Sequence, residues 1–236
     1  MRTLMLVLLA GLAGCGDVKT DWACGEQDPP PPEVTVLRVK QRWLNEEGDR
    51  ASVWSGTGFP ISTNGLISFR HELPSNVEHV YVEGELAPVL DRGNKETIWD
   101  DWVHVRFQSA PDRIPTLDPK VELHPGERVA MVGFSTHGIP KHRLNKLRRE
   151  GIPARALYGK VAFHPSYFDL PEEVVLINAG NVTPHGLSGG PVMVLRDNKW
   201  VVVGIMVTEG EHRILRGLFS YRLLVARRLP EHLLEK

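Results

Sequence analysis

The stretch Thr183–Pro191 combines the residue types that can present a nucleophile on a tight turn. It reads Thr183-Pro184-His185-Gly186-Leu187-Ser188-Gly189-Gly190-Pro191, and an apolar run follows at once. Glycine has no Cβ, so Gly186 can adopt backbone conformations closed to other residues and turn its N–H toward a ligand. The N–H groups of Gly186 and Ser188 are then candidates to hold the oxyanion of an acyl-transfer reaction. The same residue types also build ordinary turns, so this chemistry requires a base and a carboxylate elsewhere.

The candidate base is His71, which comes at the end of the mostly apolar sequence Leu66-Ile67-Ser68-Phe69-Arg70-His71. A histidine at the end of a strand can be oriented by the backbone and offer one ring nitrogen to a neighbour. Its ordinary pKa, near 6.5, suits general base catalysis. The chain has 10 histidines, so His71 gains its meaning only from its partners.

The candidate carboxylate comes from the adjacent pair Asp100 and Asp101. In a strand, alternate residues share a face, which groups Asp101 with Val103, Val105 and Phe107. A carboxylate that orients a histidine belongs on the buried side. The pattern therefore favours Asp101 over Asp100, and the alternative is that both are solvated acids at the end of a strand.

Composition narrows the remaining function classes. The 236 residues are 42% hydrophobic and 24% charged, with a formal net charge of -1. A near-neutral balance gives no support for nucleic acid as a partner. The two cysteines, Cys15 and Cys24, both lie near the N-terminus, which leaves no cysteine metal site in the globular part. His137 and His142 have no acidic or cysteine partners clustered near them, so we expect a solvated loop and neither a metal nor an organic cofactor.

The N-terminal segment predicts export and lipidation. Arg2 and an apolar run from Leu4 to Leu12 have the form of a signal peptide over residues 1–14. The sequence Leu12-Ala13-Gly14-Cys15 resembles a lipobox, which implies lipidation of Cys15 and a lipid-anchored protein of the bacterial cell envelope, periplasmic or on the cell surface. Residues 15–32 then form a proline-rich tether. A soluble secreted protein is the alternative.

From residue 33 onward, many short β-like runs follow one another without intervening helices, which favours an all-β sandwich or barrel. A helical rhythm is expected only over Arg222–Leu234, and Lys141–Glu150 is expected to be an exposed loop or a short helix.

Residues 33–236 resemble trypsin-like serine proteases of the chymotrypsin fold, nearest to the bacterial high-temperature-requirement group. Three segments carry the resemblance in the order His, Asp, Ser. They are Gly56–Phe59 with Leu66–His71, Asp101–Arg106, and Gly186–Pro191.

The resemblance implies two packed antiparallel six-stranded β-barrels, over 33–118 and 119–236, with a C-terminal α-helix and no peptide-binding (PDZ) module. It also implies a serine endopeptidase with a His71/Asp101/Ser188 triad, an oxyanion hole at Gly186 and Ser188, and a polypeptide substrate. The primary pocket is expected near Val182, Val207, Thr208, Glu209 and Ser220. Val182 stands where a protease that cleaves after basic residues would carry Asp. We therefore expect the primary pocket to accept a small or medium apolar residue of the substrate.

Three departures from the family pattern keep a second function open. Arg70 replaces a small residue, Leu187 replaces Asp or Asn, and Val207 replaces Ser or Thr. A catalytically degenerate binding or scaffold lipoprotein is the alternative. An α/β-hydrolase esterase is disfavoured, because the strand-rich pattern does not fit and few residues follow Ser188.

Overall fold

The computed structural model describes residues 34–44, 51–70, 73–74, 77–94, 97, 100–107, 113–162, 171–180, 182–214 and 219–234. For residues 42–44, 51–54, 149, 209–214 and 219–222 it describes the backbone alone. The predicted signal peptide, Cys15 and the tether lie outside these ranges. Within them, no helix has both the length and the apolar character needed to cross a membrane.

The first barrel is formed by the N-terminal half of the chain. Among the described residues, six antiparallel strands close on themselves in the order β1-β2-β3-β6-β5-β4. Their bounds are β1 Leu37–Leu44, β2 Ala51–Ser62, β3 Gly65–Ser68, β4 His79–Val82, β5 Glu85–Arg92 and β6 Val103–Arg106. The longest pairing is that of β1 with β2, from Leu37 opposite Gly58 to Leu44 opposite Ala51.

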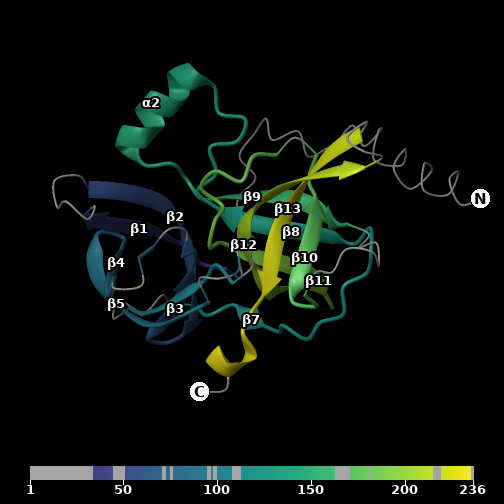
Figure 1. Ribbon diagram of the computed structural model, residues 1–236, viewed down its shortest axis with the longest axis horizontal. Helices are drawn as coiled ribbons and strands as arrows, with labels where there is room; N and C mark the ends of the chain where they lie inside the picture. The colour runs from purple at the N-terminus through teal and green to yellow at the C-terminus, as the bar shows by residue number, and fades with distance from the viewer. Residues whose placement is uncertain are drawn as a thin grey trace, which may run out of the picture.

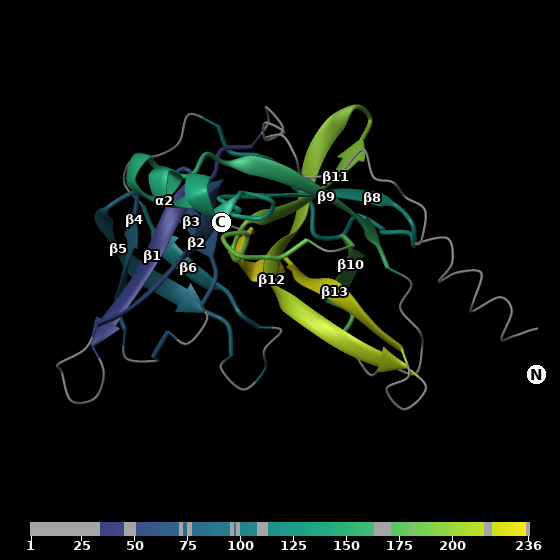
Figure 2. The ribbon, with the colours of Figure 1, turned by 90° about the horizontal axis from the view of Figure 1, so that it is seen from above.

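The second barrel lies beside the first (Figures 1 and 2). Its strands follow the order β11-β8-β9-β10-β13-β12, and the pairing of β11 with β12 closes the ring of six described strands. Their bounds are β8 Arg128–Gly133, β9 Arg155–Val161, β10 Val174–Asn178, β11 Pro191–Arg196, β12 Lys199–Ile214 and β13 Phe219–Arg228. A two-residue strand, β7 (Thr116–Leu117), adds to β12 in parallel. The prediction of two packed antiparallel six-stranded barrels is confirmed.

Alternation of side chains along the strands explains how each barrel fills its own interior and also packs against the other barrel. On β3, Leu66 packs into a cluster made by the first barrel, whereas the next residue, Ile67, packs into a cluster shared by both barrels. Successive side chains of a strand point to opposite faces, so a barrel can fill its own interior and cover a neighbour. The shared cluster includes Phe59 and Trp102 from the first half and Val207 from the second.

The prediction of a C-terminal α-helix is wrong. Its segment, Arg222–Leu234, forms most of strand β13 and then a 3-10 turn, η2 (Glu231–Leu233). Both faces of β13 are covered, which produces a continuous apolar run with no alternation. Two of its residues, Leu223 and Val225, pack in one cluster, and Leu224 and Ala226 pack in another.

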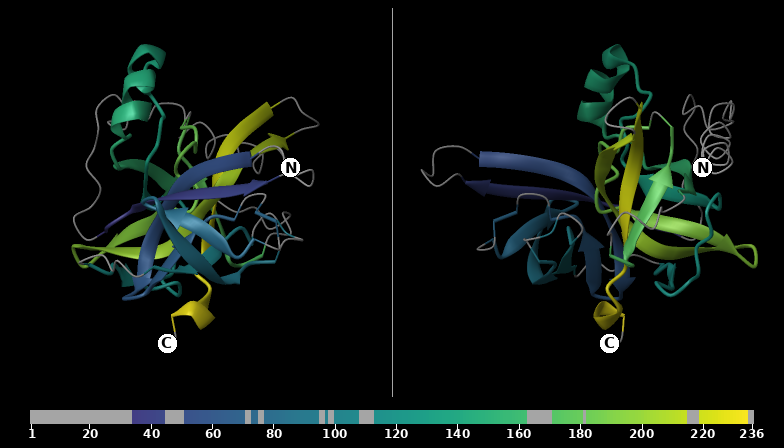
Figure 3. Two further views of the ribbon diagram at one scale, coloured as in Figure 1. Left: turned by 90° about the vertical axis from the view of Figure 1, so that its left-hand side faces the viewer. Right: turned by 45° about the vertical axis from the view of Figure 1, so that its right-hand side comes forward.

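The segment Lys141–Glu150 is helix α2. It lies in the connection between β8 and β9, and Figures 1 and 3 show it standing above the barrels at the opposite end of the molecule from η2.

Candidate functional site

Ser188, the candidate nucleophile, lies in the loop of residues 182–190 (the nucleophile loop). This loop leads into β11 at the contact between the barrels. On one side, Thr57 of β2 donates its backbone N–H to the Ser188 carbonyl at 2.9 Å. On the other, Gly189 N–H donates to the Met206 carbonyl of β12 at 2.8 Å. The serine is half-buried. The loop is therefore fixed from both barrels.

A type II turn precedes the serine. Leu187 N–H donates to the Pro184 carbonyl at 2.7 Å, and Gly186, at the third position of the turn, has φ 84°. A type II turn requires a positive φ there, which glycine accepts without strain. A Cβ on Gly186 would also lie 2.3 Å from the Phe134 carbonyl oxygen. The glycine that the sequence singles out is thus required by both the turn and its surroundings.

Two carbonyl contacts fix how the peptide groups around the serine point. The His185 carbonyl accepts the Thr136 N–H at 3.2 Å, and the Leu187 carbonyl accepts the Gly190 N–H at 2.8 Å. In a trans peptide the N–H points opposite to the C=O. The N–H groups of Gly186 and Ser188 therefore point away from those two donors.

Thr57 holds the same loop through its side chain. Its hydroxyl donates to the Gly186 carbonyl at 2.7 Å and accepts the Phe134 N–H at 3.2 Å. Its own carbonyl accepts the Ser68 hydroxyl at 2.6 Å, and the residue is completely buried. Sequence analysis placed Thr57 in the glycine-rich segment Gly56–Phe59 but assigned it no role.

Asp101 is buried and contacts the residue that precedes the predicted base in the chain. Its Oδ1 accepts the backbone N–H of Arg70 at 2.9 Å, and Arg70 directly precedes His71. His71 itself lies outside the described residues, so its contacts with Asp101 and Ser188 stay a prediction.

Asp100 occupies a different environment from its neighbour. Its carboxylate accepts the indole N–H of Trp102 at 2.7 Å and the backbone N–H of Asn94 at 2.5 Å, and it pairs with Arg227 of β13. Asp100 therefore joins the first barrel to the second, while Asp101 lies against residue 70. This difference agrees with the period-two argument that favoured Asp101.

Arg70, one of the departures from the family pattern, directs its guanidinium to the Gly93 carbonyl. Burial lowers the pKa of Arg70, and the attraction of Asp101 acts in the opposite direction. Leu187, the second departure, is completely buried in the apolar cluster of the second barrel.

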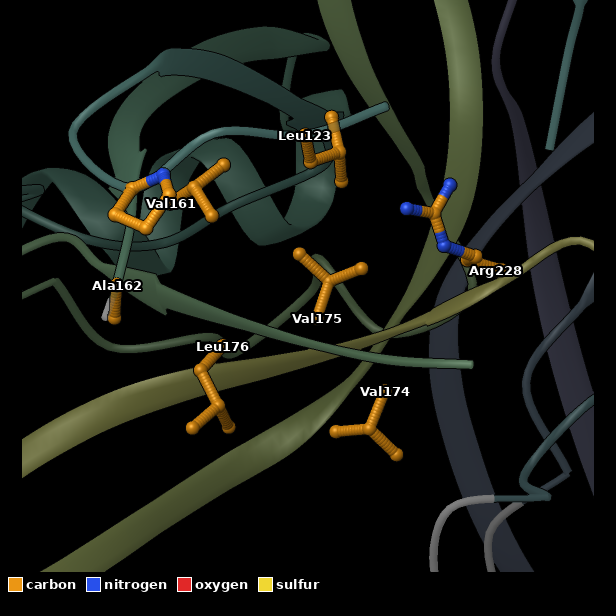
Figure 4. A pocket seen from close by; sticks show the side chains of 8 residues that line it. Leu123, Val161, Ala162, Val174, Val175, Leu176 and Arg228 are labelled. Carbon is orange, nitrogen blue, oxygen red and sulfur yellow. The ribbon is translucent and has the colours of Figure 1, made fainter. Parts of the chain in front are cut away.

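The predicted pocket residues occupy two different environments. Val182 packs in the cluster of the second barrel, whereas Val207 packs in the cluster shared by the barrels. Thr208 is half-buried. The side chains of Glu209 and Ser220 lie outside the described residues. A separate groove, drawn in Figure 4, contains none of these residues; it is lined by Leu123, Pro125, Val161, Ala162, Val174, Val175, Leu176 and Arg228.

His137 supports the start of the nucleophile loop, a role that sequence analysis missed. Its Nδ1 accepts the Thr183 backbone N–H at 3.2 Å, and its carbonyl accepts a hydrogen bond from Arg155 at 2.7 Å. Burial, and to a smaller extent the charge of Arg155, lowers the pKa of His137. The expectation of a solvated loop at His137 is therefore wrong, whereas His142 is exposed on α2.

Among the described residues, no group of three or more His, Cys, Asp or Glu side chains is placed to hold a metal ion.

Comparison with solved structures identifies the fold. The crystal structure of the Rv3671c protease from M. tuberculosis in its active form matches with a TM-score of 0.50 and 18% identity, over 83% of this chain and 76% of that chain. Its inactive form also gives a TM-score of 0.50, at 16% identity, over 86% of this chain and 93% of that chain. The chain has the chymotrypsin-like fold of trypsin-like serine proteases. No protein-family model matches its sequence.

Among curated sequences, the similarity is partial and is to a different class of protein. The maltose/maltodextrin import ATP-binding protein MalK of Yersinia pestis bv. Antiqua and of Yersinia pseudotuberculosis is 25% identical over 133 residues. The match covers 56% of this chain but only 31% of that protein. A phosphate-binding loop needs Ser or Thr after Gly-Lys, but Val161 follows Gly159-Lys160, the one Gly-Lys pair in the sequence.

Proposed function

We propose that the protein is a serine endopeptidase with Ser188 as nucleophile, His71 as general base and Asp101 as the carboxylate that orients it. The observation that carries the proposal is the nucleophile loop. On a chymotrypsin-like fold, the Thr136 N–H and the Gly190 N–H bind the carbonyls of His185 and Leu187, so the N–H groups of Gly186 and Ser188 point away from these two donors. The contact between Asp101 and the backbone of Arg70 supports the rest of the triad.

In this mechanism, the Ser188 Oγ attacks the carbonyl carbon of a peptide bond while His71 accepts the hydroxyl proton. The N–H groups of Gly186 and Ser188 stabilise the negative charge that develops on the carbonyl oxygen. His71 then returns the proton to the leaving amine, and the acyl group remains on Ser188. Water, activated by His71, hydrolyses the ester, and Asp101 stabilises the imidazolium in both halves of the reaction.

Labelling with a fluorophosphonate tests the proposal, because this probe phosphonylates a serine whose hydroxyl is activated. We expect full-length protein in mild detergent to label, and Ser188→Ala and His71→Ala to lose the label. Ser55→Ala is the matched control, since Ser55 is exposed on β2 and should label as wild type does. Loss of the serine should reduce kcat by about a million-fold if the triad behaves like others measured.

A folded wild-type protein that fails to label would overturn the endopeptidase proposal. Circular dichroism and a cooperative unfolding transition establish the folded state in the same sample. That outcome would favour the degenerate scaffold lipoprotein.

We also propose that Cys15 carries the lipid that attaches the protein to the bacterial envelope. The support is the lipobox-like sequence alone. Metabolic labelling with a clickable palmitate analogue in a bacterial host tests it. The wild type should incorporate the analogue and Cys15→Ser should not, whereas equal labelling of Cys24→Ser and wild type shows that the second cysteine is not the acceptor.

For specificity, we propose cleavage after a small or medium apolar residue, because Val182 stands where a protease that cleaves after basic residues would carry Asp. Profiling with a peptide library tests this preference. Selection of lysine or arginine at the same position would contradict it.

A further inference from the structure

Helix α2 carries an unusual concentration of positive charge. Its ten residues contain five Lys or Arg and a single acidic residue, Glu150. Four of these cations have described side chains, and all four are exposed: Lys141, Arg143, Lys146 and Arg148. Lys146 lies 3.8 Å from Glu150, and within the described part of the chain the other three have no carboxylate within ion-pair distance. This cluster contrasts with the formal net charge of -1 for the whole chain.

The stability of the helix accounts for cations near its C-terminus, such as Arg148, but not for those in its first turn. The positive end of the helix dipole lies at the N-terminus, where acidic residues are favourable and cations unfavourable. The first turn of α2 instead contains Lys141 and Arg143, with no acidic residue and no side-chain cap from Pro140. Cations placed where they weaken the isolated helix point to an anionic partner that offsets their repulsion.

The helix is connected at both ends to the candidate active site. Before it, Thr136 donates to the His185 carbonyl of the nucleophile loop, and Lys141 is only the fifth residue after Thr136. Five residues span at most about 18 Å of extended chain. After it, the Ile152 carbonyl accepts a 2.7 Å hydrogen bond from Arg38 of β1, whose guanidinium lies over the Phe134 ring. The segment before the helix is thus held against the loop that contains Ser188, and Figure 3 shows the helix projecting away from the barrels.

We propose that α2 binds an acidic segment of the polypeptide substrate and holds it beside Ser188. The proposal rests on the endopeptidase function proposed above and adds the class of substrate. Several exposed cations on one short helix attract a run of carboxylates more strongly than any single surface pair, and the attraction weakens with salt. An anionic lipid surface is the competing occupant.

The experiment compares two fluorogenic peptides that share the cleavable core selected by library profiling. One carries a tail of alternating Glu and Asp, and the other the same tail with Gln and Asn. We expect the acidic peptide to have a KM about tenfold lower for wild type, as several surface ion pairs together would give. The quadruple variant K141Q/R143Q/K146Q/R148Q should lose this preference and keep kcat on the neutral peptide. Glutamine is a good helix former, so α2 should persist.

The matched control removes four exposed cations outside α2, in the variant R106Q/R113Q/K160Q/K199Q. It has the same net charge as the α2 variant and should keep the tenfold preference. Equal KM for both peptides in wild type, or an equal loss in the two quadruple variants, overturns the inference. In 0.5 M salt the preference should largely disappear.

Binding without turnover separates this inference from the proposed function. Fluorescence anisotropy with a labelled acidic peptide should show binding to full-length Ser188→Ala protein and none when the four α2 substitutions are added. If fluorophosphonate labelling fails but this binding persists, the endopeptidase function is wrong and α2 still binds acidic polypeptide. Co-sedimentation with phosphatidylglycerol vesicles that depends on α2, without peptide binding, would instead overturn the substrate assignment.

Discussion

A single buried hydroxyl, that of Thr57, connects the first barrel to both segments that shape the candidate oxyanion site. It donates to Gly186 in the nucleophile loop and accepts from Phe134 after β8, while the backbone N–H of the same residue holds Ser188. The position of Ser188, the proposed nucleophile, therefore depends on a strand that contributes no predicted catalytic group. Because small displacements of reacting groups have large effects on rate, we expect this hydroxyl to matter for turnover.

Replacing Thr57 with valine should lower the fluorophosphonate labelling rate by about ten- to a hundred-fold. Valine keeps the shape of the side chain but leaves the Gly186 carbonyl and the Phe134 N–H without this partner. Thr57→Ser restores the hydroxyl and should recover most of the rate. If kcat of Thr57→Val is unchanged while only its thermal stability falls, the hydroxyl has a structural role alone.

The adjacent residues Asp100 and Asp101 allow a test of which carboxylate orients the predicted base. Asp101→Asn should reduce kcat by about ten-thousand-fold, as loss of the orienting carboxylate does in other triads, with little effect on folding. Asp100→Asn should do the reverse, since Asp100 pairs with Arg227 across the barrels: activity stays near wild type and the melting temperature falls. Steady-state kinetics and thermal melts of the two variants decide the assignment, and equal activity in both would contradict it.

Sequence reasoning reached some of these residues and missed others for a physical reason. The choice between Asp100 and Asp101 followed from strand periodicity, which is local. Thr57 and His137 act through contacts with residues far along the chain, at Gly186 and Thr183. Neither residue type nor spacing carries that information, although Thr57 lies within the glycine-rich segment that the sequence already marked.

At the scale of elements, the connection between β8 and α2 is coupled to protonation through His137. Its Nδ1 accepts the Thr183 N–H, which requires the neutral ring, and burial together with Arg155 lowers its pKa. The unfolded state therefore binds a proton more readily than the folded state. The stabilisation is complete above the ordinary histidine pKa of 6.5 and is lost as the pH falls through the lower folded-state pKa.

Chemical denaturation at pH 7.5, 6.5 and 5.5 tests this coupling. We expect the free energy of unfolding of wild type to fall over that range more steeply than that of His137→Gln. Glutamine can still accept the Thr183 N–H through its amide oxygen but does not titrate. Parallel curves for the two proteins would show that His137 contributes nothing to the pH dependence.

The sequence predicted the class of the fold better than it predicted individual elements. The two antiparallel six-stranded barrels were expected and are observed. Strand β5 has Ala87 as its one buried residue, so hydrophobicity does not mark it as a strand, and it exists through its pairing with β4 and β6. Strand β13 was mistaken for a helix because both of its faces are covered.

At the scale of the molecule, the cluster shared by the barrels joins residues from opposite ends of the described chain. Val34 before β1 and Leu229 and Leu233 after β13 pack in it with Phe59 and Trp102. His232 of the same turn lies 3.1 Å from Asp91 and beside the Trp102 ring. The turn η2 therefore packs against Trp102, the residue that follows Asp101 in the chain.

Leu233→Ala should reduce the free energy of unfolding by about 2–5 kcal/mol, as other buried leucine truncations do. Leu195, at 48% exposure, provides the control, and Leu195→Ala should change stability by less than about 0.5 kcal/mol. Urea denaturation measures both. A Leu233→Ala protein as stable as wild type would mean that η2 does not hold the barrels together.

The position of η2 also determines when during biosynthesis the packing around the candidate site can be completed. A ribosome makes the Asp101 strand long before it makes Leu229 and Leu233, yet these late residues complete the apolar support behind Trp102. Domains can fold as they emerge during synthesis, but this contact cannot form until the last strand has been delivered. If the proposed endopeptidase function holds, we expect a nascent chain to carry the Ser188 loop without activity until Leu229 and Leu233 have packed beside Trp102.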